Sequence, residues 1–112
     1  MTTQEFNKHL EFIQQETVET LKAKAEEYAV DGDRLHNFRV AAALESCTME
    51  TALGGMMAKH TVSVYDLIME TELGRDVPKE LWLEKIKDHI NYLYLLWAMV
   101  NEKGAEDGET AD

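Results

Sequence analysis

The sequence predicts an all-α fold, an antiparallel helical bundle of three long helices and one short helix. Apolar residues recur at steps of three, four or seven along most of the 112-residue chain, which is the period of an amphipathic helix. No segment alternates apolar and polar residues in the manner of a strand. Turn-forming residues separate the helical segments by short connectors, which favours antiparallel neighbours.

The first helix is expected to begin at Thr2, because "TTQE" has the pattern of a capping box in which Thr2 and Glu5 satisfy free backbone amides. The helix is expected to end near Ala29. Residues 30–37, "VDGDRLHN", then form a polar connector in which Asp33 or Asn37 can cap the next helix. The apolar line of the first helix consists of Phe6, Leu10, Ile13, Thr17, Leu21 and Tyr28.

A short alanine-rich helix, "FRVAAALES", follows from residue 38. Thr48 is placed to cap a third helix, and Gly74 is suited to end it. Asp76 and Pro78 then mark the start of the fourth helix. The sequence therefore divides residues 38–103 into one short and two long helices.

The fourth helix has the clearest apolar repeat in the chain, and this seam is expected to pack against neighbouring helices. Its members are Leu83, Ile86, Ile90, Leu93, Trp97 and Val100. A second apolar line lies beside the seam and consists of Tyr92, Leu96 and Met99. Two such lines exceed what a lone small bundle needs, so we expect a homo-oligomer, either a dimer or a tetramer.

Composition predicts one helical domain over residues 1–103 and a disordered acidic tail over residues 104–112. The 22 acidic and 11 basic residues give a net charge of −11, which disfavours binding to DNA or RNA. The sequence offers no apolar run or leader for a membrane, and its single cysteine, Cys47, agrees with a reducing compartment. We therefore expect a cytoplasmic protein.

Polar stripes run along the third and fourth helices. Their members are Lys59, Ser63, Asp66 and Glu70 on the third helix and Glu84, Asp88 and Asn91 on the fourth. If the two helices form an antiparallel hairpin centred on Val77, the stripes lie level with each other, because each helix rises about 1.5 Å per residue. The level pairs are Glu70 with Glu84, Asp66 with Asp88 and Ser63 with Asn91.

Carboxylates brought together in this way repel one another, so they must bind a cation, share protons or turn to solvent. Mg²⁺ suits them best because it accepts carboxylate oxygens while keeping waters that a phosphate can displace, and Mn²⁺ is the alternative. The competing interpretation is a solvated acidic face on an acidic protein, which is the usual fate of such residues.

Basic and amide side chains in the connector "DRLHNF" are candidates for substrate binding, because guanidinium groups match phosphate geometry. The expected binding residues are Arg34, His36, Asn37, Lys59, Ser63 and Asn91. The connector residues fit a cap and turn equally well, and Lys59 fits an ion pair with a carboxylate one turn away. The aromatic side chains of Tyr28, Phe38 and Trp97 are able to stack on a base, but aromatic residues at helical spacing are more often core. His60 lies on an apolar line, where a core histidine is favoured over a ligand or a base.

From about residue 22 to residue 100, the chain resembles the MazG-like all-α nucleotide pyrophosphohydrolases. It is most similar to small phage-associated proteins with a nucleotide-modification-associated domain. The segments that carry the resemblance are "KAEEY", "DRLHNF", "KHTVSVYDL" and "EKIKDHINYLYLL".

The resemblance implies a helical core in which acids hold Mg²⁺ against a nucleoside triphosphate, so that water releases pyrophosphate and leaves the monophosphate. Carried over, the catalytic and metal-binding residues are Asp66, Glu70, Glu84 and Asp88. MazG-like enzymes usually space these acids as E-x-x-E and E-x-x-D, whereas both pairs here are one residue wider. The departure leaves an inactive nucleotide-binding relative as an alternative to an enzyme.

Two functions of different classes are therefore open. The first is a Mg²⁺-dependent nucleoside triphosphate pyrophosphohydrolase, or a relative that binds nucleotides through the same residues. The second is a non-catalytic, oligomeric helical module that binds another protein through the fourth helix.

Overall fold

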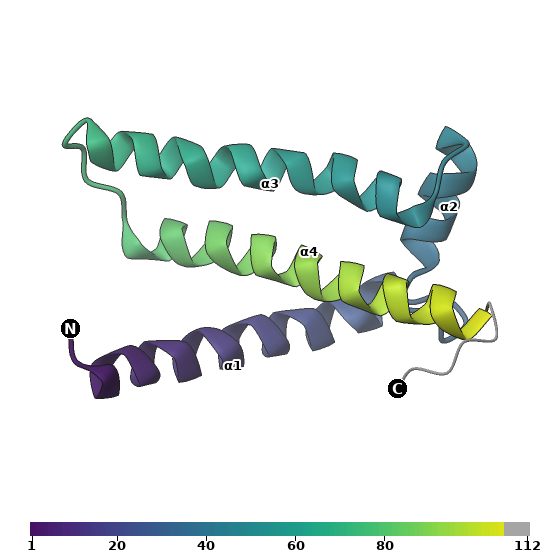
Figure 1. Ribbon diagram of the computed structural model, residues 1–112, viewed down its shortest axis with the longest axis horizontal. Coiled ribbons are helices and arrows are strands. Elements are labelled where there is room, and N and C mark those ends of the chain that lie inside the picture. Colours follow the sequence, from purple (N-terminus) through teal and green to yellow (C-terminus); the bar gives the residue numbers. More distant parts are fainter. Residues whose placement is uncertain (107–112) are drawn as a thin grey trace.

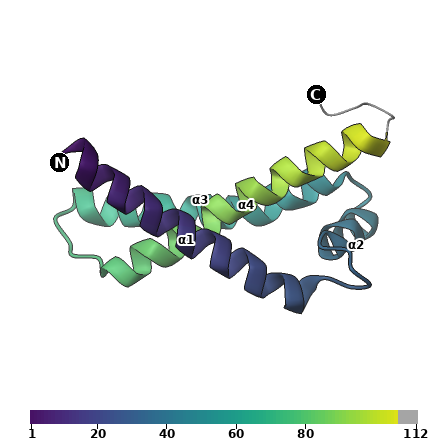
Figure 2. The same cartoon turned by 90° about the horizontal axis from the view of Figure 1, so that it is seen from below.

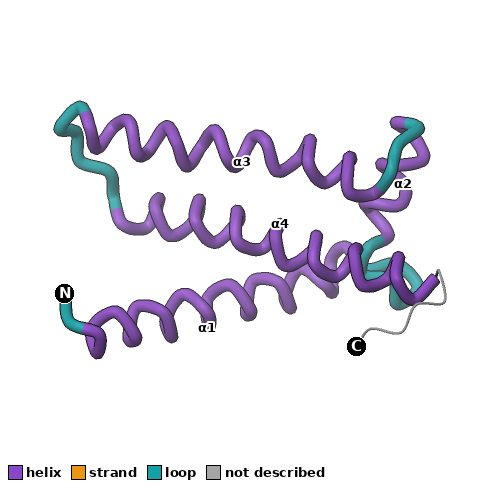
Figure 3. Tube along the Cα trace, in the orientation of Figure 1, coloured by secondary structure: helices purple, strands orange, loops and turns teal. Residues whose placement is uncertain are grey.

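The computed structural model describes residues 1–106, which form four helices and no strand (Figure 1, Figure 3). The helices are α1 (Thr3–Tyr28), α2 (His36–Glu45), α3 (Met49–Glu72) and α4 (Lys79–Glu106). Three of them are long and α2 is short, which confirms the all-helical class. None of these helices combines the length and apolar character needed to cross a bilayer.

Helix α4 continues to Glu106 and so extends into the acidic tail expected from residue 104. The rest of that predicted tail, residues 107–112, lies outside the described residues.

The helix ends follow the side-chain chemistry expected from the sequence. The Thr2 hydroxyl accepts a hydrogen bond from the Glu5 amide at 3.1 Å, and the Glu5 carboxylate accepts one from the Thr2 amide at 3.3 Å. Likewise, the Thr48 hydroxyl accepts from the Thr51 amide at 3.1 Å. Helix α3 stops just before Gly74, whose φ of +77° is a left-handed conformation that favours glycine.

Helices α3 and α4 lie side by side and run in opposite directions, with α2 across one end of α3 (Figure 1). Helix α1 packs on α4, runs in the same sense as α4 and crosses it at an angle (Figure 2). The radius of gyration is 16.7 Å, compared with about 13 Å expected for a compact chain of this length. The single chain is therefore elongated. Much of the surface of α1 is exposed to solvent.

The buried core lies near α2, where this helix meets α3 and the second half of α4. Its buried members are Leu35, Phe38, Leu53 and Met99. Partly buried apolar side chains surround them: Met49, Met56, Met57, Tyr92, Leu95 and Leu96. Burying each large apolar side chain contributes about 1.5 to 3 kcal/mol, so this cluster fixes the end of the molecule that carries the connector.

The seam predicted on α4 faces solvent in its second half. Leu93, Trp97 and Val100 are 50%, 69% and 52% exposed, whereas Met99 and Tyr92 from the second line pack in the core. The prediction that the whole seam packs within the bundle is wrong for this half in the single chain. Both lines have helical spacing, and spacing alone does not tell which line meets a neighbour.

The apolar line predicted on α1 is also buried only in part. All residues from 1 to 12 are exposed, including Phe6 and Leu10. Thr17 is buried and Leu21 is half-buried, because only this later part of the line is covered. The early part of α1 therefore presents apolar side chains to solvent.

Candidate functional site

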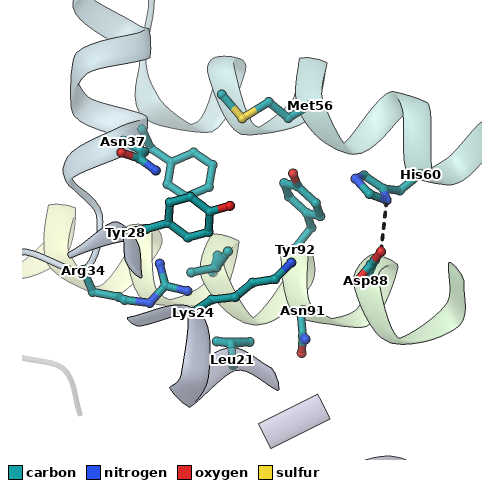
Figure 4. A pocket seen from close by; sticks show the side chains of 12 residues that line it. Leu21, Lys24, Tyr28, Arg34, Asn37, Met56, His60, Asp88, Asn91 and Tyr92 are labelled. Carbon is teal, nitrogen blue, oxygen red and sulfur yellow. Dashed lines mark ion pairs between the residues drawn. The ribbon is translucent and has the colours of Figure 1, made fainter. Parts of the chain in front are cut away.

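A cavity of about 280 Å³ lies between the helices, close to the lower end of the range of about 300 to 1,000 Å³ typical of small-molecule sites. We call it the central cavity (Figure 4). Every helix and the connector after α1 contribute to it. The lining residues are Leu21, Lys24, Tyr28, Arg34, Asn37, Phe38, Met56, His60, Asp88, Asn91, Tyr92 and Leu95.

Aromatic rings form much of the wall of the central cavity. Tyr28 points toward Tyr92 across the cavity, with Phe38 also in the lining (Figure 4). The rings of Tyr92 and His60 lie with their centroids 4.8 Å apart and their planes inclined by 38°. Such rings offer flat apolar faces against which a planar ligand can stack.

Two cationic side chains extend into the same space, Lys24 from α1 and Arg34 from the connector (Figure 4). Among the described residues, neither forms an ion pair, because the carboxylate pairs there involve Arg39, Arg75, Lys87 and His60 instead. In a chain with a net charge of −11, unpaired cations directed into one cavity favour an anionic ligand.

Asn91 is the most buried polar residue of the lining, with 8% of its surface exposed. Its Oδ1 atom has no hydrogen-bond partner among the described residues. A buried acceptor left unpaired costs about 1 to 3 kcal/mol. In Figure 4 this amide points away from Tyr28, Tyr92 and Lys24, on the other side of α4 from Tyr92.

Asp88 is the acidic residue of the lining. Its Oδ2 atom lies 4.0 Å from His60 Nδ1, and its side chain is about one-fifth exposed. Burial raises the pKa of the neighbouring Tyr92 hydroxyl, and the charges of Asp88 and Tyr28 raise it further. Tyr92 therefore stays protonated at neutral pH and keeps a hydrogen atom to donate.

The connector that carries Arg34 is held in place by Arg39 of α2. Arg39 Nε donates to Asp33 Oδ2 at 2.7 Å, and its guanidinium also donates to Glu102 of α4. The hydrogen bond from Arg39 holds the pKa of Asp33 below its usual value. Asp33 in turn accepts from the Leu35 amide at 3.0 Å. These bonds fix the connector against α2 and α4.

Helix α2 begins at His36, before the start expected at residue 38. Asp33 stabilises this earlier start by accepting from the Leu35 amide just ahead of the helix. Asn37, which was expected as a possible cap, lies within the first turn instead and lines the central cavity.

The structure does not bring the four predicted metal-binding carboxylates into one cluster. Asp66 and Glu84 are exposed, and Glu70 accepts hydrogen bonds from Arg75, the shorter at 3.1 Å. Of the four, Asp88 alone lines the central cavity. Within the described residues, no three His, Cys, Asp or Glu side chains are grouped so that they could hold a metal ion. The four acids therefore do not share one cluster in the described part of a single chain, because equal height on two helices does not fix which way the side chains point. Binding of Mg²⁺ or Mn²⁺ stays a prediction.

Half of the predicted binding residues line the central cavity: Arg34, Asn37 and Asn91. The other three do not line it. Ser63 donates its hydroxyl to the Lys59 carbonyl oxygen at 3.0 Å within α3, and Lys59 itself is exposed. His36 is half-buried at the start of α2 but lies outside the lining.

Among the lining residues with a polar or charged side chain, sequence reasoning missed four: Lys24, Tyr28, His60 and Tyr92. Three of them were assigned to apolar lines, where a core role is the usual one, and Lys24 has the spacing of a solvated face. The segments that resemble the MazG-like proteins contain all four, and this was the available signal.

Comparison of the chain with protein-family models, with curated proteins and with solved structures finds no match. The fold and the cavity define a small four-helix protein with an aromatic and cationic cavity where its helices meet. A fold of this kind does not by itself specify an activity, so function is inferred from the chemistry of the cavity.

Proposed function

We propose that the protein binds a nucleotide in the central cavity. The observation that carries the proposal is the approach of Lys24 and Arg34, both without a carboxylate partner in the described residues, to a cavity walled by aromatic rings. In this arrangement the phosphate lies at the two cations, and the base lies among Tyr28, Phe38 and Tyr92.

The parts of the lining match the parts of a nucleotide. Arg34 supplies a planar fork for phosphate oxygens, and the tyrosine rings supply faces for a base. The resemblance of the segments that contain these residues to nucleotide pyrophosphohydrolases points to the same class of ligand.

The proposal extends to hydrolysis of the bound nucleotide, which makes a further demand on the site. Release of pyrophosphate needs a divalent cation, Mg²⁺ or Mn²⁺, and Asp88 is the one predicted acid that lines the central cavity. The other three acids do not converge on it within one chain, so the geometry favours binding over catalysis.

Isothermal titration calorimetry with nucleoside monophosphates and triphosphates, with and without Mg²⁺, tests the proposal. Arg34→Gln should weaken binding by about tenfold or more, because a hydrogen bond to a charged group contributes about 1.5 to 3 kcal/mol. Arg75→Gln is the matched control, since Arg75 is exposed and pairs with Glu70 away from the central cavity. An absence of binding across the panel, or equal losses in both variants, would overturn the proposal; released pyrophosphate reports hydrolysis in the same samples.

A second candidate function is self-association through exposed apolar surfaces. The exposed half of the α4 seam, formed by Leu93, Trp97 and Val100, is the observation that favours it. The outer face of α3 adds a further exposed apolar line of Val62, Tyr65 and Met69. A dimer or tetramer that covers these surfaces is compatible with nucleotide binding and with a non-catalytic module.

A further inference from the structure

A second hollow, which we call the side groove, lies between α1 and α4 and has a volume of about 440 Å³. Its lining residues are Val18, Leu21, Lys22, Ala25, Arg34 and Tyr94. Leu21 and Arg34 also line the central cavity, so the two spaces adjoin at these side chains. Arg34 is thus a cation at the border of both spaces.

The chemistry of the side groove differs from that of the central cavity. Apart from the cations Lys22 and Arg34, its lining is apolar or aromatic. Neither cation has an ion-pair partner in the part of the chain that the structure describes. The groove thus offers an aromatic face for stacking and positive charge at its edge. The Tyr94 hydroxyl is the one uncharged polar side-chain group among its lining residues.

We infer that the ligand is a dinucleoside phosphate, with a second base in the side groove. This inference rests on the proposed nucleotide binding. The bridging phosphate lies at Arg34, the only residue with a charged side chain that both linings share. One base occupies the central cavity, and the second stacks on Tyr94 beside Val18.

The position of the phosphate supports this choice of ligand. A mononucleotide with its phosphate at Arg34 fills the central cavity and leaves the apolar side groove in contact with water. A second base covers that apolar surface and stacks on the ring of Tyr94, so it adds to the affinity for the dinucleotide. Because every base has a face that can stack on an aromatic ring, the second base is accepted with little preference among bases.

Calorimetry with each ribonucleoside 5′-monophosphate and the corresponding 3′,5′-dinucleoside monophosphate tests the inference. The dinucleotide carries the smaller negative charge, so electrostatic attraction alone predicts that it binds more weakly. Stacking in the side groove predicts that it binds about tenfold more tightly. The ratio of the two affinities is the measured quantity.

Tyr94→Ala should lower this ratio to one or below, because only the electrostatic difference then remains. Val18→Ser should lower it as well, without removing an aromatic ring. Tyr65→Ala is the matched control and should keep the wild-type ratio, because Tyr65 is exposed on α3 outside both linings. Thermal melts of each variant verify that it is folded.

The outcomes separate the two proposals. If nucleotides bind but the dinucleotide has no advantage, or if Tyr94→Ala leaves the ratio unchanged, the inference is overturned while nucleotide binding stands. If no nucleotide or dinucleotide binds, the proposed function itself fails. If Tyr94→Ala changes the mass of the particle in light scattering and not the ratio, the side groove is an interface between copies of the chain, which also overturns the inference.

Discussion

His60 of α3 and Tyr92 of α4 stack with their ring centroids 4.8 Å apart, and this contact forms one side of the central cavity. Asp88, one helical turn before Tyr92, lies beside His60 with a separation of 4.0 Å between Oδ2 and Nδ1. The pair joins the two helices that carry the predicted polar stripes, although it belongs to neither stripe. Aromatic packing, and not the acidic residues, therefore defines this part of the site.

Asn91→Leu should raise the free energy of unfolding by about 1 kcal/mol, because it removes a buried acceptor that lacks a partner. The same change should leave nucleotide binding nearly unchanged, since the Asn91 amide oxygen points away from Tyr28 and Tyr92 (Figure 4). Urea denaturation and calorimetry measure the two effects, and Asn101→Leu, at an exposed position on α4, is the control. Lower stability in Asn91→Leu would mean that the side chain makes a bond essential for folding.

Asp33→Asn should lower the melting temperature at pH 7, and the difference from wild type should shrink in acid. Arg39 holds the pKa of Asp33 below its usual value, so its ionised form favours folding above about pH 4. That contribution is lost as the pH falls through the lowered pKa. Thermal melts between pH 2.5 and pH 7 measure the effect, with the exposed Asp66→Asn as the control. A difference that stays constant with pH would contradict the assignment.

Asp88→Asn should strengthen binding of a nucleotide without metal, by up to about fivefold, because it removes a negative charge from the lining of the central cavity. Asp66→Asn should have no effect, since Asp66 is exposed outside the central cavity. Calorimetry in the presence of a chelator measures both. If both substitutions instead abolish Mg²⁺-dependent binding, the carboxylates act together in an assembly of several chains.

Trp97→Glu should disrupt self-association, because it places a charge in the exposed α4 seam. Light scattering coupled to gel filtration should give a multiple of 12.8 kDa for the wild type and a lower mass for the variant. Leu44→Glu is the control, since Leu44 is highly exposed on α2, away from α4. A wild-type protein that is already monomeric at micromolar concentration would rule out the predicted oligomer.

The sequence by itself determined the helices and most of their ends. The capping box at Thr2 and Glu5, the cap at Thr48 and the stop at Gly74 all depend on residues within a few positions of each other. Local hydrogen bonding and backbone conformation decide such features, so a local pattern is enough to predict them.

Tertiary structure decided which helix faces meet. Trp97 and Met99 are two residues apart on lines with the same spacing, yet Trp97 is exposed and Met99 is fully buried. Likewise, Asp66 and Asp88 share a predicted height, but only Asp88 reaches the central cavity. Periodicity fixes position along a helix, whereas the rotation of each helix against its neighbours follows from the packing of the whole chain. For that reason the sequence predicted correctly that the segments with the polar stripes are helices. Which residues line one cavity was decided only by the tertiary structure.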